Sequence, residues 1–563
     1  MAITETHPNP ETDSAAAASA GASVGFPETT GIAAVVSSGD HKTIGRLYIG
    51  FSLLMGLIAL ALLAVFNLSS VKGSTLLTAD RPFQAFTLGQ LSAVLLFLMP
   101  LFLGLAIAVV PLQIGARTVA FPRAAAASFW VWLISSIVLV VSYIPGVGGG
   151  MAIDPSTAAD PVVGKEMSEL TFVALIGVAL ALLLASVCVV TTIVALRTSG
   201  LHLDQIPLFS WSMLVAGGIW LLTVPVFIGN VALILVDIKH GAPAYFGVTY
   251  NQWPQLAWFV TQPQVFAFAI PVLGIAGDAV ATFSRGRQPQ RGGLLFAIGL
   301  LGALSLGAYA QPAFFPGIWL QWIFALQGFA LFLPLVIMVG GVLLALKTGE
   351  PKLKAPALLG IVSLLLLMLA AFAAAPFGFG RLGLQYMPKV MTSSPALKAA
   401  GTGSPVYTWG ILGLVLGAAA TGAAAGLFLW APKLTGRRLN DGLGKLLILV
   451  FGAGTLLIGL PLCVLGFASK YQGLEDSADT LFGAAALGAA ILLFGVLVTM
   501  ILHLATRVSV LGGGATDEPD AWGSGASLEW AADSPPTRGN FGELAHVTSP
   551  EPLFDLAEAE GAD

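Results

Sequence analysis

The sequence predicts an all-α, polytopic membrane protein built as a bundle of twelve transmembrane helices. Of its 563 residues, 56% are hydrophobic and 10% are charged, whereas soluble domains carry about 25% charged residues. The mean hydropathy is +0.89. Twelve apolar runs of roughly 20 residues, the length that spans a bilayer, follow one another along the chain. This composition excludes a soluble protein, and the net charge of -4 offers no basic surface for nucleic acid.

Short loops separate the predicted helices, and no soluble domain interrupts them. Glycine and alanine within the runs, as at 413–430, let neighbouring helices approach closely. Because the number of helices is even, we expect both termini on the same side of the membrane. The predicted helices are 46–68, 86–110, 128–147, 168–196, 208–236, 256–277, 293–310, 318–346, 356–376, 406–431, 444–467 and 480–505.

The distribution of Lys and Arg predicts the orientation of the bundle. Seventeen of the 25 basic residues lie in loops and helix ends on the side that carries the termini. Loops rich in Lys and Arg remain in the cytoplasm. We therefore expect an integral protein of a bacterial-type plasma membrane with both termini cytoplasmic.

Composition divides the chain into three regions. Residues 1–39 are rich in small and polar residues and are predicted to be a disordered cytoplasmic tail. Residues 40–507 contain all the apolar runs and form the predicted membrane domain. Residues 508–563 are rich in Gly, Asp, Glu and Pro, and we expect an acidic, disordered cytoplasmic tail.

Ionisable side chains are almost absent from the interiors of the predicted helices. Proteins that move electrons or protons across membranes keep such groups there, and haem needs axial ligands such as His, Met or Cys. One histidine, His503, lies within a run, and its position near the end predicts an interfacial role. The polar residues that remain are mostly amides, which we expect to form hydrogen bonds between helices. They include Gln262, Gln264, Gln311, Gln321 and Gln327.

Five stretches carry distinctive patterns. They are DHKTIGRLYIGFSLL (40–54), VPLQIGARTVAFPR (110–123), VVTTIVALRTSGLHLDQIPLFSWSMLVAGG (189–218), WFVTQPQVFAFAIPVLGI (258–275) and GLFLWAPKLTGRRLND (426–441). In order and spacing, these stretches resemble subunit I of the haem-copper oxidases, the cytochrome c oxidase family. The resemblance extends from about residue 40 to residue 505 and implies that family's twelve-helix bundle.

The resemblance also implies where haem ligands should lie. The family's second helix begins F-T-x-H-G, and its histidine binds the low-spin haem. The matching stretch here places Gly89 at that position. The tenth-helix pattern H-F-H, which supplies one ligand to each haem, falls on Gly410, Ile411 and Leu412. All three haem-ligand positions therefore hold residues that cannot coordinate iron.

The copper site of the family is changed in the same way. Its sixth helix reads H-P-E-V-Y, with a copper-binding histidine, a proton-relay glutamate and a tyrosine bonded to that histidine. The corresponding residues here are Gln262, Gln264 and Phe266. The histidine pair of the seventh helix, which completes the copper site, falls on Ala310 and Gln311.

Two proton-uptake positions of the family are also substituted. The acid in the loop after the second helix corresponds to Thr118, and the lysine of the other path falls near Trp319. We therefore predict no catalytic residue and no metal or haem site at the family positions. We further predict that the protein contains no cofactor, although the family binds haem and copper.

Three functions are compatible with these substitutions. The first is a non-catalytic homologue of subunit I that acts as a structural or assembly subunit of a respiratory oxidase, with membrane lipid and proteins of the subunit II or III type as partners. The second is an active terminal oxidase, transferring electrons from cytochrome c to oxygen, with non-standard ligands. The third is a small-molecule carrier whose cavity is lined by Gln262, Gln264 and Gln311. We expect instead that these three amides hydrogen-bond one another.

Overall fold

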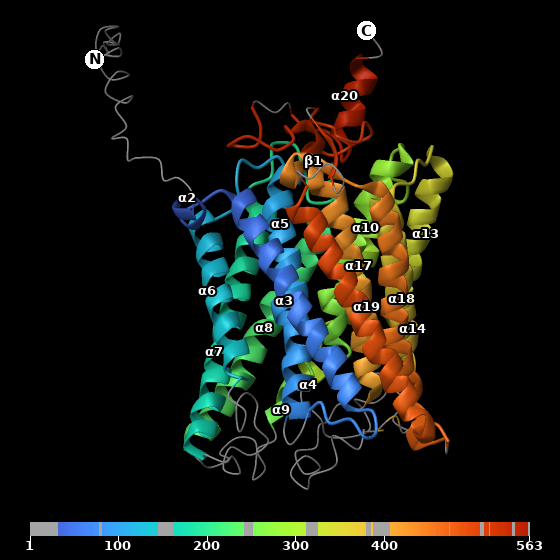
Figure 1. Ribbon diagram of the computed structural model, residues 1–563. Coiled ribbons are helices and arrows are strands. Elements are labelled where there is room, and N and C mark those ends of the chain that lie inside the picture. Colours follow the sequence, from blue (N-terminus) through green and yellow to red (C-terminus); the bar gives the residue numbers. More distant parts are fainter. Residues whose placement is uncertain are drawn as a thin grey trace, which may run out of the picture. The chain divides into compact units, whose positions relative to one another are not determined.

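The computed structural model describes residues 32–77, 81–144, 161–240, 252–310, 325–378, 384, 386, 406–471, 473–506, 512–516, 518–542 and 546–560 (Figure 1). Within these residues the chain is mostly helical, as the sequence predicts. Two compact units are distinguished, Met1–Gly39 and Asp40–Asp563. Of the first unit the structure describes a short helix, α2 (Ile32–Val36). The rest of the predicted N-terminal tail, residues 1–31, lies outside the described residues.

Helices long and apolar enough to cross a membrane number eleven in the described part of the chain. A shorter apolar helix, α11, corresponds to the predicted seventh span. The helices of the bundle are α3 (His41–Ser69), α4 (Arg81–Leu91), α5 (Met99–Gln113), α6 (Pro122–Val141), α7 (Pro161–Ala195), α8 (Leu208–His240), α10 (Ile270–Ser284), α11 (Arg291–Leu304), α13 (Phe332–Thr348), α14 (Ala355–Ala374), α17 (Val406–Thr435), α18 (Asp441–Gly466) and α19 (Ala478–Leu504).

Shorter elements connect or extend these helices. A π-helical segment, η1 (Ser92–Leu98), joins α4 to α5, so that Arg81–Gln113 forms one span. The remaining elements are α9 (Gln252–Ala257), η3 (Gln264–Phe268), η4 (Ala308–Ala310), η6 (Ala375–Gly378), η8 (Phe467–Ser469), η9 (Glu475–Ser477), η10 (Leu528–Ala531), α20 (Pro552–Glu560) and the strands β1 (Arg437–Leu439) and β2 (Gly512–Ala515).

Local sequence signals explain where several helices begin. Asp40 caps α3 by accepting a hydrogen bond from the backbone N–H of Lys42, and Asn440 caps α18 through the N–H of Leu443. Such caps satisfy amide groups that have no partner within the helix. Pro122 occupies the first turn of α6, where its missing N–H costs nothing.

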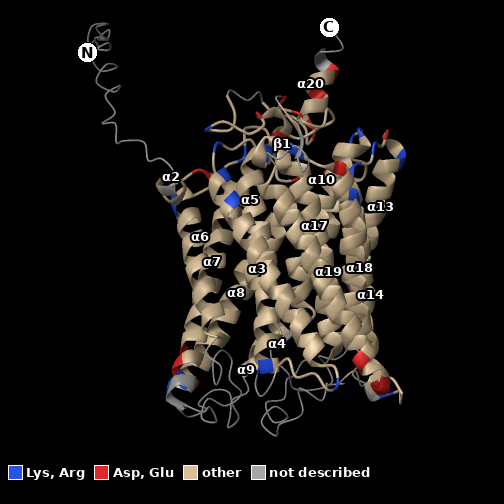
Figure 2. Ribbon diagram, viewed as in Figure 1, with Lys and Arg blue, Asp and Glu red and all other residues tan. Residues whose placement is uncertain are grey.

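Two spans form the centre of the bundle. The side chains from Pro82 to Gln113 and from Val406 to Leu434 are all buried. Outer helices surround them, and neighbours in space include α3 with α19, α6 with α7, and α18 with both α17 and α19. Figure 2 shows charged residues at the two ends of these helices and long stretches without charge between them. This charge pattern is the one that a bilayer requires.

The end of the bundle that carries β1 also holds most of the C-terminal segment (Figure 1). We call it the β1 end. Here β1 and β2 pair antiparallel, with Arg437 opposite Ala515 and Leu439 opposite Gly512. Residues 518–542 continue across this end, and the indole of Trp522 donates to the carbonyl oxygen of Leu429 in α17 at 3.0 Å.

The described part of the C-terminal segment therefore differs from the predicted disordered tail. Leu528, Trp530 and Val547 are buried there. The acidic average composition suggested disorder, but a few large apolar side chains supply enough area to bury against the bundle. A fully buried residue of this kind contributes about 1.5–3 kcal/mol. The prediction was wrong because it weighed the average and not these individual residues.

Candidate functional site

The predicted ligand positions lie on the most deeply buried parts of the bundle. Gly89 belongs to α4, Gly410 and Leu412 to α17, and Gln264 to η3, just before α10. Each of these elements lies at the centre of the protein, with no side chain of α17 from Val406 to Leu434 exposed. The positions at which the resemblance places ligands therefore lie in the interior of the bundle.

The region beside Leu412 is filled by the protein's own side chains. The ring of Phe86 lies 4.6 Å from that of Trp409 and 5.2 Å from the rings of Phe66 and Trp253, measured between centroids. A cavity of only about 20 Å³ remains there, roughly the space of one water molecule. Its lining residues are Leu63, Phe66, Asn67, Phe86, Gln90, Trp409, Leu412, Gly413, Ile458 and Leu462.

Gly410 lies where α17 packs directly against the backbone of α18. A Cβ atom at this position would be 2.7 Å from the backbone nitrogen of Cys463 and 2.7 Å from the carbonyl oxygen of Gly459. Both atoms belong to the backbone of α18 and cannot turn aside as a flexible side chain could. Any side chain at position 410 therefore requires the two helices to separate.

Gln264 is fixed by neighbouring helices. Its Nε2 donates to the hydroxyl of Thr223 in α8 at 3.1 Å, and its Oε1 accepts from the N–H of Gly307 at 2.9 Å. Gln262 is also buried, but neither atom of its amide group has a hydrogen-bond partner. The expectation that Gln262 and Gln264 bond each other is therefore wrong, because Gln264 finds its partners in α8 and in the residue before η4.

The other predicted positions are distributed as follows. Phe266 is completely buried in η3, and Ala310 is the last residue of η4. Thr118 lies half-buried in the loop after α5. Gln311 and Trp319 lie outside the described residues, so their predicted roles stay predictions. Gly89 faces Leu62 and Leu63 of α3, whereas Leu412 lines the small cavity together with Phe86 and Gln90.

The loop around Thr118 is held by contacts from distant parts of the chain. The N–H of Ala120 donates to the hydroxyl of Thr192 in α7 at 2.8 Å. From the C-terminal segment, Nδ2 of Asn540 donates to the carbonyl oxygens of Ala116 and Arg117, at 2.8 and 3.3 Å. These contacts hold the loop from α7 on one side and from the C-terminal segment on the other. The loop has a structural partner in this chain.

Two buried side chains, Gln113 and Glu529, and the partly buried Asp278 meet beneath the C-terminal segment. Nε2 of Gln113, at the end of α5, donates to Oδ2 of Asp278 at 3.0 Å and to Oε1 of Glu529 at 3.1 Å. Asp278 also accepts from the N–H groups of Leu208 and Phe209, at 2.9 and 3.0 Å. We call Gln113, Asp278 and Glu529 the acid cluster. It joins α5, α10, α8 and the C-terminal segment.

Lys433 provides a second buried link between the bundle and the C-terminal segment. Its side chain lies at the end of α17 and is 2% exposed. The ammonium group donates to the carbonyl oxygens of Pro519 and Ala532 and to the hydroxyl of Ser534, at 2.8, 2.5 and 3.0 Å. It also lies 5.4 Å from the centre of the Trp530 ring, a favourable cation–π distance.

Sequence reasoning missed both links. The sequence nevertheless contained a signal of burial at Glu529. This residue stands between two large apolar residues, Leu528 and Trp530, and such residues are uncommon in a disordered acidic segment. The two apolar neighbours bury the acid between them and bring it to Gln113.

Docking of the C-terminal segment should weaken as the pH rises. Burial raises the pKa of Glu529 above its ordinary value of 4.5, against the opposing effect of the hydrogen bond from Gln113. A raised pKa favours the protonated, docked form, so the docking free energy is fully present below the ordinary value and is lost as the pH rises through the raised value. The carboxylate of Asp278 repels an ionised Glu529, whereas the ammonium group of Lys433 attracts it.

Hydrogen–deuterium exchange of residues 518–542, corrected for the intrinsic dependence on pH, should show this loss of protection. In Glu529→Gln, whose amide oxygen still accepts from Gln113, the protection should become nearly independent of pH. Equal pH dependence in Glu529→Gln and the wild type would contradict the assignment to Glu529.

Comparison with known proteins supplies the family. A family model described as "Cytochrome C and Quinol oxidase polypeptide I" matches residues 43–379, more than half of the chain. The chain belongs to this family. The matched region contains α3 to α14 and therefore most of the bundle, including the positions of Gly89, Gln262 and Gln264.

Several proteins named as oxidase subunits are similar along nearly the whole chain. "Putative cytochrome c oxidase subunit 1-beta" of Streptomyces coelicolor is 29% identical over 537 residues, which cover 92% of this chain and 89% of that protein. "Cytochrome c oxidase subunit 1" of Corynebacterium glutamicum is 28% identical, with 94% and 91% covered. "Heme-copper oxidase subunit I+III" of Aeropyrum pernix is 28% identical, with 93% and 63% covered.

These similarities contradict the prediction that the protein contains no cofactor. The chain is a cytochrome c oxidase subunit I-like protein, and one relative carries haem and copper in its name. The prediction extrapolated from a few ligand positions to the whole protein. A large, flat macrocycle is held mainly by apolar contacts spread over several helices, at about 25 cal/mol per Å² of buried surface, so a ligand count does not decide its presence.

The described residues at the family's ligand positions do not fit those groups in this structure. Copper sites use imidazole or thiolate ligands, and the described residues contain no group of three or more His, Cys, Asp or Glu side chains able to hold a metal ion. The cavity beside Leu412 has about 20 Å³, whereas pockets that bind organic ligands measure roughly 300–1,000 Å³. No chemical step can be derived through haem or copper at these positions.

Proposed function

We propose that this protein is a non-catalytic, subunit I-like component of a respiratory oxidase complex that supports the assembly or stability of its partner subunits. The observation that carries the proposal is the close contact of α17 with α18 at Gly410. In this chain, the helix segment that bears ligands in the family serves helix packing. Membership of the family supports a respiratory oxidase as the type of complex. The contact between α17 and α18 supports a structural role within it.

The acid cluster and the Lys433 contacts support the same role. Both hold the C-terminal segment against the ends of α5, α10 and α17. They place described parts of the C-terminal segment over this end of the bundle, where it offers a surface for contact with another protein. We further propose that this end faces the cytoplasm, because Lys and Arg are concentrated in its loops, and that partners of the subunit II or III type contact the bundle.

The alternative is an active oxidase subunit with non-standard ligands, which the names of the relatives favour. A substitution at Gln262 distinguishes between these two functions. It stands at the family's copper-ligand position and makes no hydrogen bond, so a change to leucine removes a potential ligand without breaking an internal contact. The proposed function predicts that Gln262→Leu leaves oxygen consumption per assembled complex unchanged.

The test uses the complex purified from membranes through a tag on this chain, in a strain that lacks the wild-type gene. Deletion of the chain should reduce the amount of partner subunits in the membrane, and Gln262→Leu should restore them with full oxygen consumption. If Gln262→Leu assembles normally but abolishes oxygen consumption, the chain takes part in the chemistry and the proposed function is wrong. Unchanged partner levels after deletion would also overturn it.

A further inference from the structure

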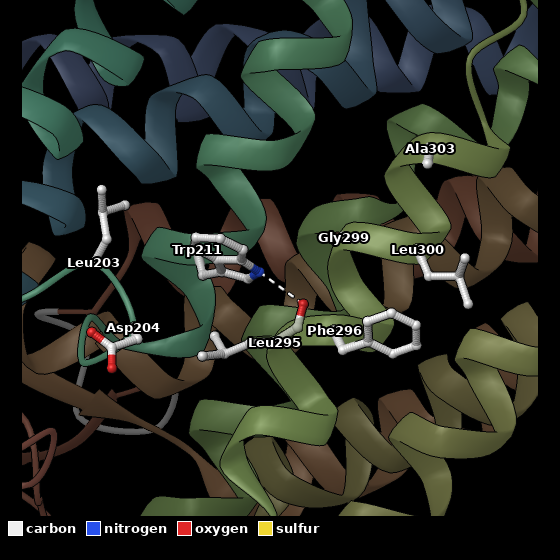
Figure 3. Close-up of a pocket in the computed structure, with 8 residues that line it drawn as sticks. All are labelled: Leu203, Asp204, Trp211, Leu295, Phe296, Gly299, Leu300 and Ala303. Atoms are coloured by element: carbon white, nitrogen blue, oxygen red, sulfur yellow. Dashed lines mark hydrogen bonds between the residues drawn. The ribbon is translucent and has the colours of Figure 1, made fainter.

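An open groove runs along the outer surface of the bundle between α8 and α11, and no described segment fills it. Its volume is about 630 Å³. Figure 3 shows Trp211 of α8 and several residues of α11 along its length, with Leu203 and Asp204 from the loop before α8 at one end. The lining residues are Leu203, Asp204, Trp211, Leu295, Phe296, Gly299, Leu300 and Ala303.

The walls of the groove are apolar, and Gly299 leaves empty space at its floor. The indole of Trp211 donates to the carbonyl oxygen of Leu295 at 3.0 Å, which fixes the ring against α11. Phe296 is 61% exposed and projects from the same helix. A Cβ atom at Gly299 would meet no atom within 4 Å. The open space at Gly299 therefore belongs to the groove and is not needed for contact between helices.

One end of the groove is polar. Asp204 is exposed there, and Arg291, the first residue of α11, donates from Nε to the backbone oxygen of Asp204 at 3.2 Å. Arg291 also donates to the backbone oxygen of Ile206. The carboxylate of Asp204 is thus exposed at this end, and the guanidinium group of Arg291, held by the backbone of the loop, lies near enough to interact with it electrostatically. This arrangement matches a ligand head that carries both a positive and a negative charge.

The length of the groove matches one leaflet of a bilayer. From Arg291 to Ala303 the helix rises by about 18 Å, at 1.5 Å per residue. The hydrocarbon core of a bilayer is about 30 Å thick, so one leaflet contributes roughly 15 Å. The polar end lies at the β1 end of the bundle, and the apolar walls extend from it toward the middle of the membrane. An acyl chain has this length and polarity.

We propose that this groove is a binding site for a zwitterionic phospholipid, phosphatidylethanolamine, from the leaflet at the β1 end. One acyl chain lies over Gly299 between Trp211 and Leu300. The ammonium group of the head pairs with Asp204, and the phosphate lies on the side of Arg291. A transmembrane helix of a partner is a poorer match, because helices pack through small residues and here Phe296 and Leu300 project into the contact surface.

The test measures retained lipid by native mass spectrometry of the full-length protein in detergent containing equal amounts of phosphatidylethanolamine and phosphatidylglycerol with identical acyl chains. The wild type should retain phosphatidylethanolamine in several-fold excess. In Gly299→Phe the new ring fills the groove, and this retention should fall to the level of non-specific binding. Gly452→Phe is the matched control, because Gly452 of α18 also faces open space and lies outside the groove.

Asp204→Asn tests the head group separately and leaves the groove intact. It should reduce the preference for phosphatidylethanolamine over phosphatidylglycerol several-fold while acyl-chain binding persists. Equal retention by Gly299→Phe and the wild type would overturn the site, even if the variant is less stable, provided that Asp204→Asn also has no effect. A wild-type preference for phosphatidylglycerol would overturn the assigned ligand. The same holds if Gly299→Phe loses a bound polypeptide that the wild type retains, while the amount of bound lipid stays the same.

Discussion

Replacing Gly410 with alanine should lower the stability of the protein by about 1–3 kcal/mol, the usual cost of forcing extra atoms into a packed core. The added methyl group meets backbone atoms of Gly459 and Cys463 at 2.7 Å. These atoms cannot move without displacing α18 from α17. The midpoint of thermal unfolding, measured in detergent by the fluorescence of intrinsic tryptophan, should fall by several degrees.

Gly452→Ala is the control for the effect of alanine on helix stability. Both substitutions gain about 1 kcal/mol of intrinsic helix propensity, but Gly452 faces open space, so its variant should be as stable as the wild type or slightly more. Gly410→His, which restores the family's residue, should be less stable than Gly410→Ala. A stable Gly410→His protein would show that α17 and α18 separate easily and would contradict the packing described here.

Replacing Lys433 with methionine should release the C-terminal segment from the β1 end. Methionine has nearly the same volume but cannot donate, so the carbonyl oxygens of Pro519 and Ala532 lose the ammonium group that they share. Hydrogen bonds from a charged donor contribute about 1.5–3 kcal/mol each. Residues 518–542 should therefore lose protection against hydrogen–deuterium exchange, while the buried spans α4–α5 and α17 keep theirs.

Lys354→Met provides the matched comparison. The ammonium group of Lys354 lies 5.0 Å from the centre of the Trp522 ring, another contact with the same segment. An exposed cation–π contact contributes about 0.5–1 kcal/mol, so this variant should retain most of the protection. Equal loss of protection in the two variants would mean that charge alone, and not the buried hydrogen bonds of Lys433, holds the segment.

The architecture of the bundle could be predicted because it depends on patterns that are local in sequence. Runs of apolar residues have to cross the bilayer, and their lengths fix the spans. The central position of the spans 86–110 and 406–431 was not predicted, although both runs are apolar enough on all sides to be buried completely. The seventh span was predicted as 293–310, but α11 ends at Leu304, where the run gives way to Ser305 and Gly307.

The contacts of individual polar side chains could not be predicted from sequence. Gln264 bonds Thr223 and Gly307, which lie 41 residues before it and 43 residues after it. Whether an amide in a membrane helix faces another amide or a hydroxyl depends on the rotation of helices about their axes. That rotation is set by packing at positions such as Gly410, and no local pattern encodes it. The burial of Glu529 has the same origin.

The bond between Asn540 and the loop after α5 has a consequence for biogenesis. The two partners, Nδ2 of Asn540 and the carbonyl oxygen of Ala116, are separated by 424 residues. At about 5–20 residues per second, a ribosome needs roughly 20 to 85 s to synthesise the chain between them. The interval between the synthesis of His41 and that of its partner Asn540 is longer still. The β1 end is therefore completed only after all the helices of the bundle have been synthesised. In a prematurely terminated chain this end lacks its C-terminal contacts and is exposed to cellular proteases.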